Sequence, residues 1–128
     1  MRTASYLLDT NVLIWLSSDV KRISAAVLDV LESFDSDLYV SAASYWELAI
    51  KQGLGKIAAD IHFDRIVEKH GMRELAITSK YALPLRDMPA HHSDPFDRML
   101  VAQAQVERLT LVTSDRRLAA YDVSVLRV

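Results

Sequence analysis

The stretch SYLLDTNVLIWL, residues 5–16, decides the fold class because it joins a short apolar strand directly to an apolar helix. Residues 5–8 are predicted as a strand that stops at Asp9, and residues 11–16 as a helix whose apolar side chains turn inward. A strand that passes at once into a helix is the first half of a crossover unit. The pattern therefore predicts further strands and helices in alternation.

The rest of the chain continues this alternation. Helices are predicted over residues 25–33 after the N-cap Ser24, 42–54 after the N-cap Ser41, 63–70, 79–83, 94–108 and 117–120. Strands are predicted over residues 38–40, 74–77, 109–113 and 123–128, and residues 84–93 are interpreted as an active-site loop. We expect an α/β three-layer sandwich, with helices on both faces of a mainly parallel central sheet.

The composition is typical of one globular domain. The chain has 128 residues, 51% hydrophobic and 25% charged, so we expect a single domain over residues 1–128. The sequence holds no cysteine, which excludes a disulfide framework and thiolate metal sites and favours a reducing cytoplasm. Residues 1–8 carry one arginine and an apolar run too short for a signal peptide or a membrane span. We expect a cytoplasmic protein with no membrane attachment.

The net charge argues against a general phosphate-binding surface but is compatible with a metal site made of carboxylates. A formal net charge of -2 is not that of a general phosphate binder, which has a strongly basic surface, so any basic patch must be local. Mild acidity is what results when several carboxylates are reserved for cations that bring positive charge only when bound.

Four acidic residues follow predicted strands or lie early in predicted helices: Asp9, Glu47, Asp97 and Asp115. Each has an ordinary explanation when taken singly, as a helix cap, as part of a capping box, or as half of an i,i+4 surface pair such as Glu47 with Lys51. In parallel sheets, however, ligands bind outside the carboxyl ends of the strands. Carboxylates gathered there repel one another unless cations neutralise them. The sequence therefore predicts a divalent-metal site at this edge.

The chemistry expected of this site is phosphodiester hydrolysis. Oxygen ligands without cysteine suit Mg²⁺, or Mn²⁺, better than zinc. Asp9 and Asp97 are the expected direct ligands, and Asp115 is a direct or water-mediated one. Glu47 is expected to hold a metal-bound water or to orient the attacking water. Asp94 is an additional carboxylate, interpreted as the cap of the helix that begins at Pro95.

Four motifs in this order resemble the PIN-domain ribonucleases, most closely the VapC-type toxins of bacterial toxin–antitoxin pairs. The motifs are LLDTNVLIWL (7–16), VSAASYWELAIK (40–51), HHSDPFDRMLVAQA (91–104) and LVTSDRRLAAY (111–121). The resemblance implies a PIN-like fold and a metal-dependent endoribonuclease that is often a homodimer. It also implies inhibition by a cognate VapB-like antitoxin. The family's acidic positions fall on the four carboxylates already chosen, and Asn11, Ser41 and Thr113 match small polar positions that support the metal site.

Other residues are candidates for RNA contact. Arg98 and Arg116 stand beside proposed ligands, where a guanidinium can clamp a phosphate or pair with a carboxylate. His92 is either a substrate or proton-transfer residue or an exposed loop histidine. Trp15 and Trp46 have apolar neighbours, which favour core packing over base stacking.

Two alternative functions stay open. Receiver and HAD-like domains also bind magnesium with aspartates at strand ends, but they use one as a phosphoryl acceptor. Receivers need paired acidic residues after the first strand, and HAD-like enzymes need a second aspartate where this sequence has Asn11. The second alternative is a catalytically silent interaction module whose acidic pocket receives an arginine from a partner.

Overall fold

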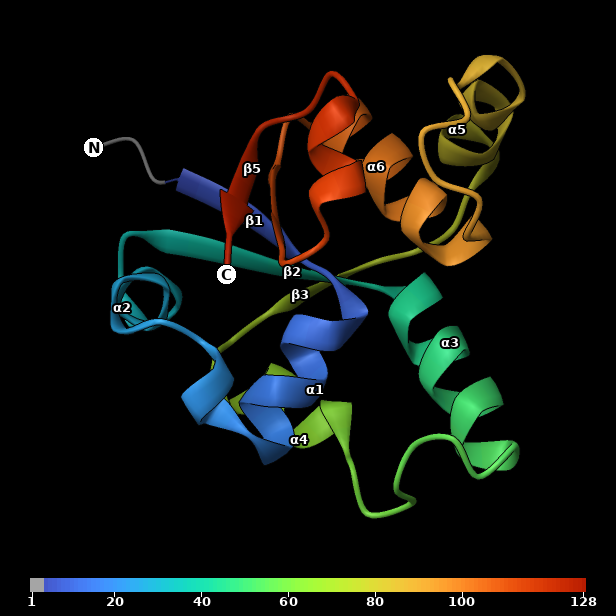
Figure 1. Cartoon of the computed structure of the whole chain (residues 1–128). Helices are drawn as coiled ribbons and strands as arrows, with labels where there is room; N and C mark the ends of the chain where they lie inside the picture. Colours follow the sequence, from blue (N-terminus) through green and yellow to red (C-terminus); the bar gives the residue numbers. More distant parts are fainter. Residues whose placement is uncertain (1–3) are drawn as a thin grey trace.

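The central sheet has five strands in the order β3-β2-β1-β4-β5, and every pairing is parallel (Figure 1). This computed structural model describes residues 4–128, so the expectation for residues 1–8 falls partly outside the described residues. The strands are β1 (Ala4–Leu8), β2 (Ser36–Ser41), β3 (Arg73–Leu75), β4 (Thr110–Thr113) and β5 (Val125–Arg127). The strand order places β1, the first element of the chain, at the centre of the sheet.

Helices connect the strands and cover both faces of the sheet. The α-helices are α1 (Thr10–Ser18), α2 (Ala25–Glu32), α3 (Ala42–Gly53), α4 (Phe63–Lys69), α5 (Ser79–Ala82) and α6 (Pro95–Glu107). Short 3-10 helices are η1 (Val20–Arg22), η2 (Leu83–Asp87) and η3 (Arg116–Ala120). In Figure 1, α1, α2 and α4 lie on one side of the sheet and α6 on the other.

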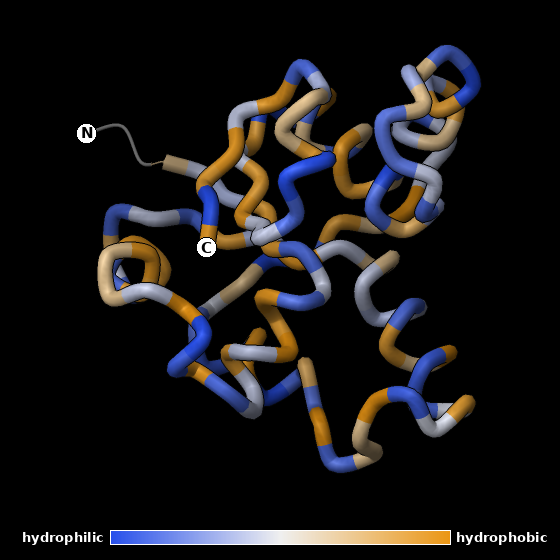
Figure 2. The backbone as a smooth tube through the Cα atoms, viewed as in Figure 1, coloured by the Kyte–Doolittle hydropathy of each residue, from blue (hydrophilic) through white to orange (hydrophobic). Residues whose placement is uncertain are grey.

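The two faces of the sheet follow from the period of a β-strand. Successive side chains point to opposite faces, so Leu7 and Leu8 enter different cores although they are neighbours in sequence. Leu8 packs with apolar residues of α1, α2, α3 and α4, whereas Leu7 packs with those of α6 and η3. Figure 2 shows hydrophobic residues recurring along the helices on both sides of the sheet, interspersed with hydrophilic ones. The expected three-layer α/β sandwich is confirmed.

Several segments differ from the sequence predictions. The strand predicted over 38–40 is longer, Ser36–Ser41, and the one predicted over 123–128 is shorter, Val125–Arg127. The strand predicted over 74–77 ends at Leu75, because its partner β2 ends at Ser41, which pairs with Leu75. The loop predicted over 84–93 begins with the 3-10 helix η2. The helix η1 was not predicted, because three residues are too few for a periodic pattern.

The carboxyl ends of β1, β2 and β4 meet at one edge of the sheet. Ser41 is the last residue of β2, Thr113 is the last of β4, and Asp9 directly follows β1. The backbone N–H of Asp9 donates to the Val112 carbonyl at 3.0 Å, which fixes Asp9 against the neighbouring strand. Within residues 4–128, none of the helices combines the length and apolarity needed to cross a membrane.

Candidate metal centre

Asp9 lies where the central strand ends and α1 begins, with 3% of its surface exposed. Its Oδ1 accepts the Val12 backbone N–H at 2.9 Å, which caps α1, and its Oδ2 accepts a hydrogen bond from the Thr113 hydroxyl. Burial raises the pKa of Asp9 to about 6. The hydrogen bonds from Thr113 and Val12 lower this pKa, and the charges of Glu47 and Asp115 raise it. Asp9 is thus buried in the field of two other carboxylates.

Glu47 reaches the same region from α3. The Ser41 hydroxyl accepts the Ala43 backbone N–H at 3.0 Å, so α3 starts directly at the edge of the sheet. Glu47 is 6% exposed, and its Oε2 lies 2.6 Å from the Lys51 ammonium. Its other oxygen, Oε1, is buried and has no hydrogen-bond partner among the described residues. The Glu47–Lys51 pair is therefore formed at i,i+4 as the spacing suggests, but its acidic end is buried rather than on the surface.

Asp97 comes from the first turn of α6. Asp94 caps this helix, because its Oδ1 accepts the backbone N–H of Phe96 at 2.8 Å and of Asp97 at 3.2 Å, and Pro95 occupies the first turn. The interpretation of Asp94 as a cap agrees with this geometry. The side chain of Asp97 does not complete a capping box, because the Asp94 backbone N–H donates instead to His92.

The environment of Asp97 is strongly anionic. Burial raises the pKa of Asp97 to about 7, and the charges of Asp94, Asp9 and Glu47 raise it further in that order. The neighbouring His92 has the opposite effect and lowers the pKa of Asp97. At neutral pH, therefore, Asp97 is protonated in a large share of the molecules until a cation compensates the neighbouring charges.

Asp115 differs from Asp9 and Asp97 because it already pairs with an arginine side chain. The Arg117 guanidinium contacts both of its oxygens, with Nε 3.1 Å from Oδ1 and a terminal nitrogen 3.0 Å from Oδ2. Asp115 also caps η3, accepting the Arg117 backbone N–H at 2.9 Å. These Arg117 hydrogen bonds lower the pKa of Asp115 to about 2. Asp115 is thus ionised at any pH at which the protein is expected to work.

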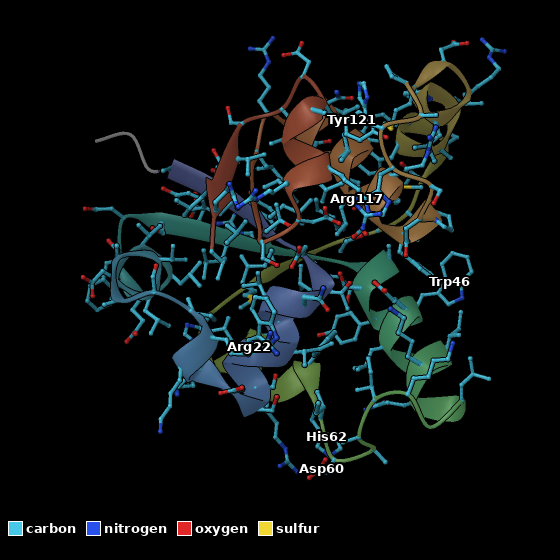
Figure 3. All side chains as sticks on the ribbon, viewed as in Figure 1. Arg22, Trp46, Asp60, His62, Arg117 and Tyr121 are labelled. Atoms are coloured by element: carbon cyan, nitrogen blue, oxygen red, sulfur yellow. The ribbon has the colours of Figure 1, made fainter. Side chains whose placement is uncertain are left out.

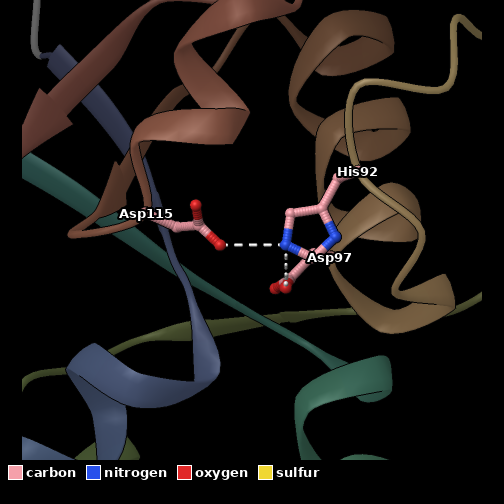
Figure 4. Close-up of side chains that lie close together, drawn as sticks. All are labelled: His92, Asp97 and Asp115. Atoms are coloured by element: carbon pink, nitrogen blue, oxygen red, sulfur yellow. Dashed lines mark hydrogen bonds and ion pairs between the residues drawn. The ribbon is translucent and has the colours of Figure 1, made fainter.

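His92 joins Asp115 to Asp97. Its Nε2 lies 2.9 Å from Oδ2 of Asp115 and 3.3 Å from Oδ2 of Asp97 (Figure 4). The Asp94 backbone N–H donates to Nδ1 of His92 at 3.0 Å, which occupies the lone pair of that nitrogen. A neutral ring must then carry its proton on Nε2, which makes Nε2 a hydrogen-bond donor. In this arrangement His92 is a donor to two carboxylates. A ring nitrogen of His92 and one oxygen each of Asp97 and Asp115 also lie within 4.8 Å of one another, a spacing at which the three residues could hold a metal ion.

The donor set fits a hard divalent cation. Carboxylates from β1, α3, α6 and the β4–η3 turn share one edge of the sheet, as the charge effects on Asp9 and Asp97 show. Glu47 Oε1 is a buried, unpartnered anionic oxygen, which is costly unless a cation or its water satisfies it. The residues that could hold such an ion are Asp9, Asp97 and Glu47, with Asp115 beside them.

The residues matched to supporting positions lie in different environments. Thr113 is buried and donates to Asp9, which is the kind of contact expected of a supporting residue. Ser41 is also buried, but its hydroxyl caps α3 rather than contacting a carboxylate. Asn11 is exposed in the first turn of α1.

The structure gives the arginines separate tasks. The Arg98 guanidinium donates to three backbone carbonyls, those of His92, Leu85 and Met88, each at 3.2 Å. Arg98 therefore anchors the segment before α6, which is a structural role in place of the expected contact with a phosphate or a carboxylate. Arg116 is exposed on η3.

The two tryptophans differ in exposure. Trp15 packs partly against the core, and the Arg22 guanidinium lies 4.7 Å from its ring centre. Trp46 is 58% exposed and points away from α3 (Figure 3), so the prediction that it packs in the core was wrong. Its ring meets Phe96 edge to face, with centroids 5.0 Å apart. Ile50 and Leu54, at helical spacing from Trp46, are also exposed, at 40% and 65%.

Sequence reasoning missed the burial of His92. Its side chain is held in the structure rather than exposed in a loop, with 5% of the residue accessible. The Tyr121 hydroxyl accepts its backbone N–H at 3.0 Å, from a residue 29 positions away. Such a contact leaves no local pattern in the sequence. The available signal was the position of His92 two residues before a strong helix cap.

Comparisons with known proteins agree with this geometry. A family model described as the PIN domain matches residues 6–124. The chain is 32% identical over 118 residues to Ribonuclease VapC22 of Mycobacterium tuberculosis, with 90% of each protein covered. A chain in the crystal structure of VapBC2 from Rickettsia felis, bound to a DNA fragment from its promoter, superposes with a TM-score of 0.73 at 15% identity, covering 97% of this chain and 98% of that one. FitAcB from Neisseria gonorrhoeae gives a TM-score of 0.60 at 25% identity over 95% and 96%.

Proposed function

Because this chain belongs to the PIN-domain family, we propose that it is a metal-dependent endoribonuclease, the toxin of a toxin–antitoxin pair that cleaves RNA and so inhibits translation. The observation that carries this proposal is the buried, unpartnered oxygen of Glu47 beside two carboxylates with raised pKa values, Asp9 and Asp97. Such a cluster is the environment that a divalent cation stabilises. The likeness to a protein named as a ribonuclease supports RNA as the substrate.

Asp9 and Asp97 would hold the ion directly, with Glu47 acting through a bound water. Asp115 would act at a distance or through water, because Arg117 and His92 already engage both of its oxygens. A bound Mg²⁺ or Mn²⁺ would supply activation of a water and stabilisation of the charge that develops on the phosphate. The carboxylates are the residues proposed as catalytic, and the identity of the ion belongs to this proposal.

The protein's own residues prepare this chemistry. Thr113 and Val12 fix the orientation of Asp9, so little reorganisation is needed when substrate binds. Lys51 fixes one oxygen of Glu47 and leaves the other free to accept a hydrogen bond from the attacking water. Burial of both carboxylates strengthens each of these electrostatic interactions.

The partners are proposed from the same comparisons. One structural neighbour is described as a toxin–antitoxin complex and another as a member of the VapBC family of toxin–antitoxin systems, which supports a VapB-like antitoxin as the inhibitor of this chain. A homodimer is the proposed assembly, on the resemblance to VapC-type toxins. The cytoplasm is the proposed compartment, because the sequence has no cysteine.

The phosphoryl-acceptor alternative is not favoured. An HAD-like enzyme needs a second aspartate two residues after the first, and that position holds the exposed Asn11. The interaction-module alternative is not favoured either, because the chain is similar over 90% of its length to a protein named as a ribonuclease.

The test is cleavage of single-stranded or looped RNA by the purified protein, with RNA ends sequenced. We expect cleavage with Mg²⁺ or Mn²⁺ and none with EDTA, and we expect Asp9→Asn and Asp97→Asn to abolish it. Equal cleavage by these variants in EDTA would overturn the metal mechanism. Trapping of beryllium fluoride on Asp9 would instead revive the phosphoryl-acceptor alternative.

A further inference from the structure

Every polar group of His92 is engaged, although the residue lies in an irregular segment. Its backbone N–H donates to the Tyr121 hydroxyl, and its carbonyl accepts from the Arg98 guanidinium. Its Nδ1 accepts the Asp94 backbone N–H at 3.0 Å. The residue is thus held by Tyr121 and by the start of α6, and the Asp94 hydrogen bond orients the ring before any ligand arrives.

The remaining nitrogen of the ring faces two carboxylates from different elements. Nε2 lies 2.9 Å from Oδ2 of Asp115, in the turn after β4, and 3.3 Å from Oδ2 of Asp97, in α6. Figure 4 shows the ring between the two acidic side chains. With the proton on Nε2, one N–H is shared between two acceptors that would otherwise repel each other.

We propose that His92 is a positioning residue that holds Asp97 and Asp115 in the relative placement required for divalent-cation binding. The proposal rests on the proposed function, because it assumes that an ion binds among these carboxylates. His92 acts through the carboxylates and touches neither ion nor RNA. Groups that orient metal-binding carboxylates by hydrogen bonds change metal affinity by about 10- to 100-fold when they are removed.

A simpler account is that His92 only anchors its own segment through Nδ1. The ring allows the two roles to be separated by two substitutions. In His92→Asn, the side-chain oxygen takes the place of Nδ1 and can still accept the Asp94 N–H, but nothing reaches the carboxylates. In His92→Gln, the amide nitrogen takes the place of Nε2 and can still donate to Asp97 and Asp115, but the acceptor for Asp94 is lost.

The experiment measures Mn²⁺ binding to the metal-free full-length protein by the electron paramagnetic resonance signal of the free ion. We expect His92→Asn to bind Mn²⁺ about tenfold or more weakly than wild type, and His92→Gln to bind within about threefold of it. With RNA, His92→Asn should lower kcat more than it raises KM. His91→Asn is the matched control, because His91 is the adjacent histidine, is exposed, and lies edge to face against the Tyr121 ring with centroids 4.9 Å apart.

The order of the two variants decides the outcome. If His92→Asn binds Mn²⁺ as tightly as His92→Gln, or more tightly, the residue only anchors its segment and the proposal is overturned. Failure of the proposed function is visible separately, because wild-type protein would then neither bind Mn²⁺ nor cleave RNA. Thermal unfolding of each variant without metal shows whether a change in affinity reflects partial unfolding.

Discussion

Asp9 and Glu47 each have a side-chain hydrogen-bond donor that is distant in sequence or one helical turn away. Thr113, on β4, donates to Asp9 across 104 positions, whereas Lys51 pairs with Glu47 from the next turn of α3. Each donor satisfies one oxygen of a buried acid that would otherwise lose its hydration without compensation. At the scale of single residues, the centre is therefore a set of acids held in place by matched donors.

Replacing Lys51 tests how much its ion pair stabilises the buried Glu47. In EDTA at pH 7, Lys51→Met should lower the free energy of unfolding by about 1–2 kcal/mol, because it leaves Glu47 charged, buried and without its donor. Urea unfolding measures this loss, and the double variant Lys51→Met, Glu47→Gln should recover most of it.

Lys80→Met is the control for this substitution. Lys80 lies 2.8 Å from Glu107, but both side chains of that pair are more exposed, at 60% and 32%. Surface ion pairs contribute little to stability, so this loss should be smaller than that of Lys51→Met. Equal losses for the two lysine variants would show that the Glu47 pair is an ordinary surface pair.

At the scale of elements, local chemistry predicted most of the architecture. Ser24, Ser41 and Asp94 each cap the helix that the sequence assigned to them. The short length of β3 could not be predicted, because it depends on where its partner β2 ends. Trp46 was misassigned for a similar reason, since an apolar helix face does not reveal whether another element covers it.

The candidate site was predictable in part. The acids could be chosen because the carboxyl ends of parallel strands must meet, which is a property of the topology. Their donors could not be chosen, because the contact between His92 and Asp115 depends on the path of residues 84–93, and that path is set by tertiary contacts. The role of Arg98 was missed for the same reason, since backbone carbonyls bind it irrespective of side-chain type.

Arg98 makes the segment before α6 behave as one element. Arg98→Lys replaces the planar guanidinium, whose two terminal nitrogens reach three carbonyls, by a single ammonium nitrogen. We therefore expect faster amide hydrogen exchange in residues 85–92 and a loss of about 1–3 kcal/mol in unfolding free energy. Amides of β1 should be affected only through the global loss of stability. Arg116→Lys is the control, because Arg116 is exposed. Unchanged exchange in Arg98→Lys would mean that other contacts hold the segment.

At the scale of the whole molecule, the clustered carboxylates of the candidate centre destabilise one edge of the sheet. Its two faces bury continuous apolar cores, whereas its carboxyl edge collects like charges that no apolar packing offsets. The stability of the whole chain should therefore depend on how those charges are compensated, by protons or by cations.

Without metal, the protein should be more stable near pH 5 than near pH 8. The folded pKa values of Asp9 and Asp97 are raised from 3.8 to about 6 and about 7, so between about pH 4 and pH 7 the folded state holds protons that the unfolded state has released. The free energy of unfolding then falls as pH rises. The two acids interact, so their effects are taken together, and the fall should be on the order of 3 kcal/mol in all. Asp115 has the opposite sign: its pKa is lowered to about 2, so its contribution is lost only as pH falls below about 4.

Added Mg²⁺ should reverse this trend. The ion competes with protons for the same oxygens, so it should raise the thermal midpoint more at pH 8 than at pH 5. Scanning calorimetry with Mg²⁺ and with EDTA at both pH values measures the effect. Asp97→Asn removes one of the two acids with a raised pKa. The pH dependence of stability without metal and the rise in thermal midpoint with Mg²⁺ should therefore both be smaller. Two results would contradict this prediction: a thermal midpoint that rises equally with Mg²⁺ at both pH values, or a Mg²⁺ shift of the same size in Asp97→Asn as in wild type. Either would mean that the ion binds elsewhere on the protein.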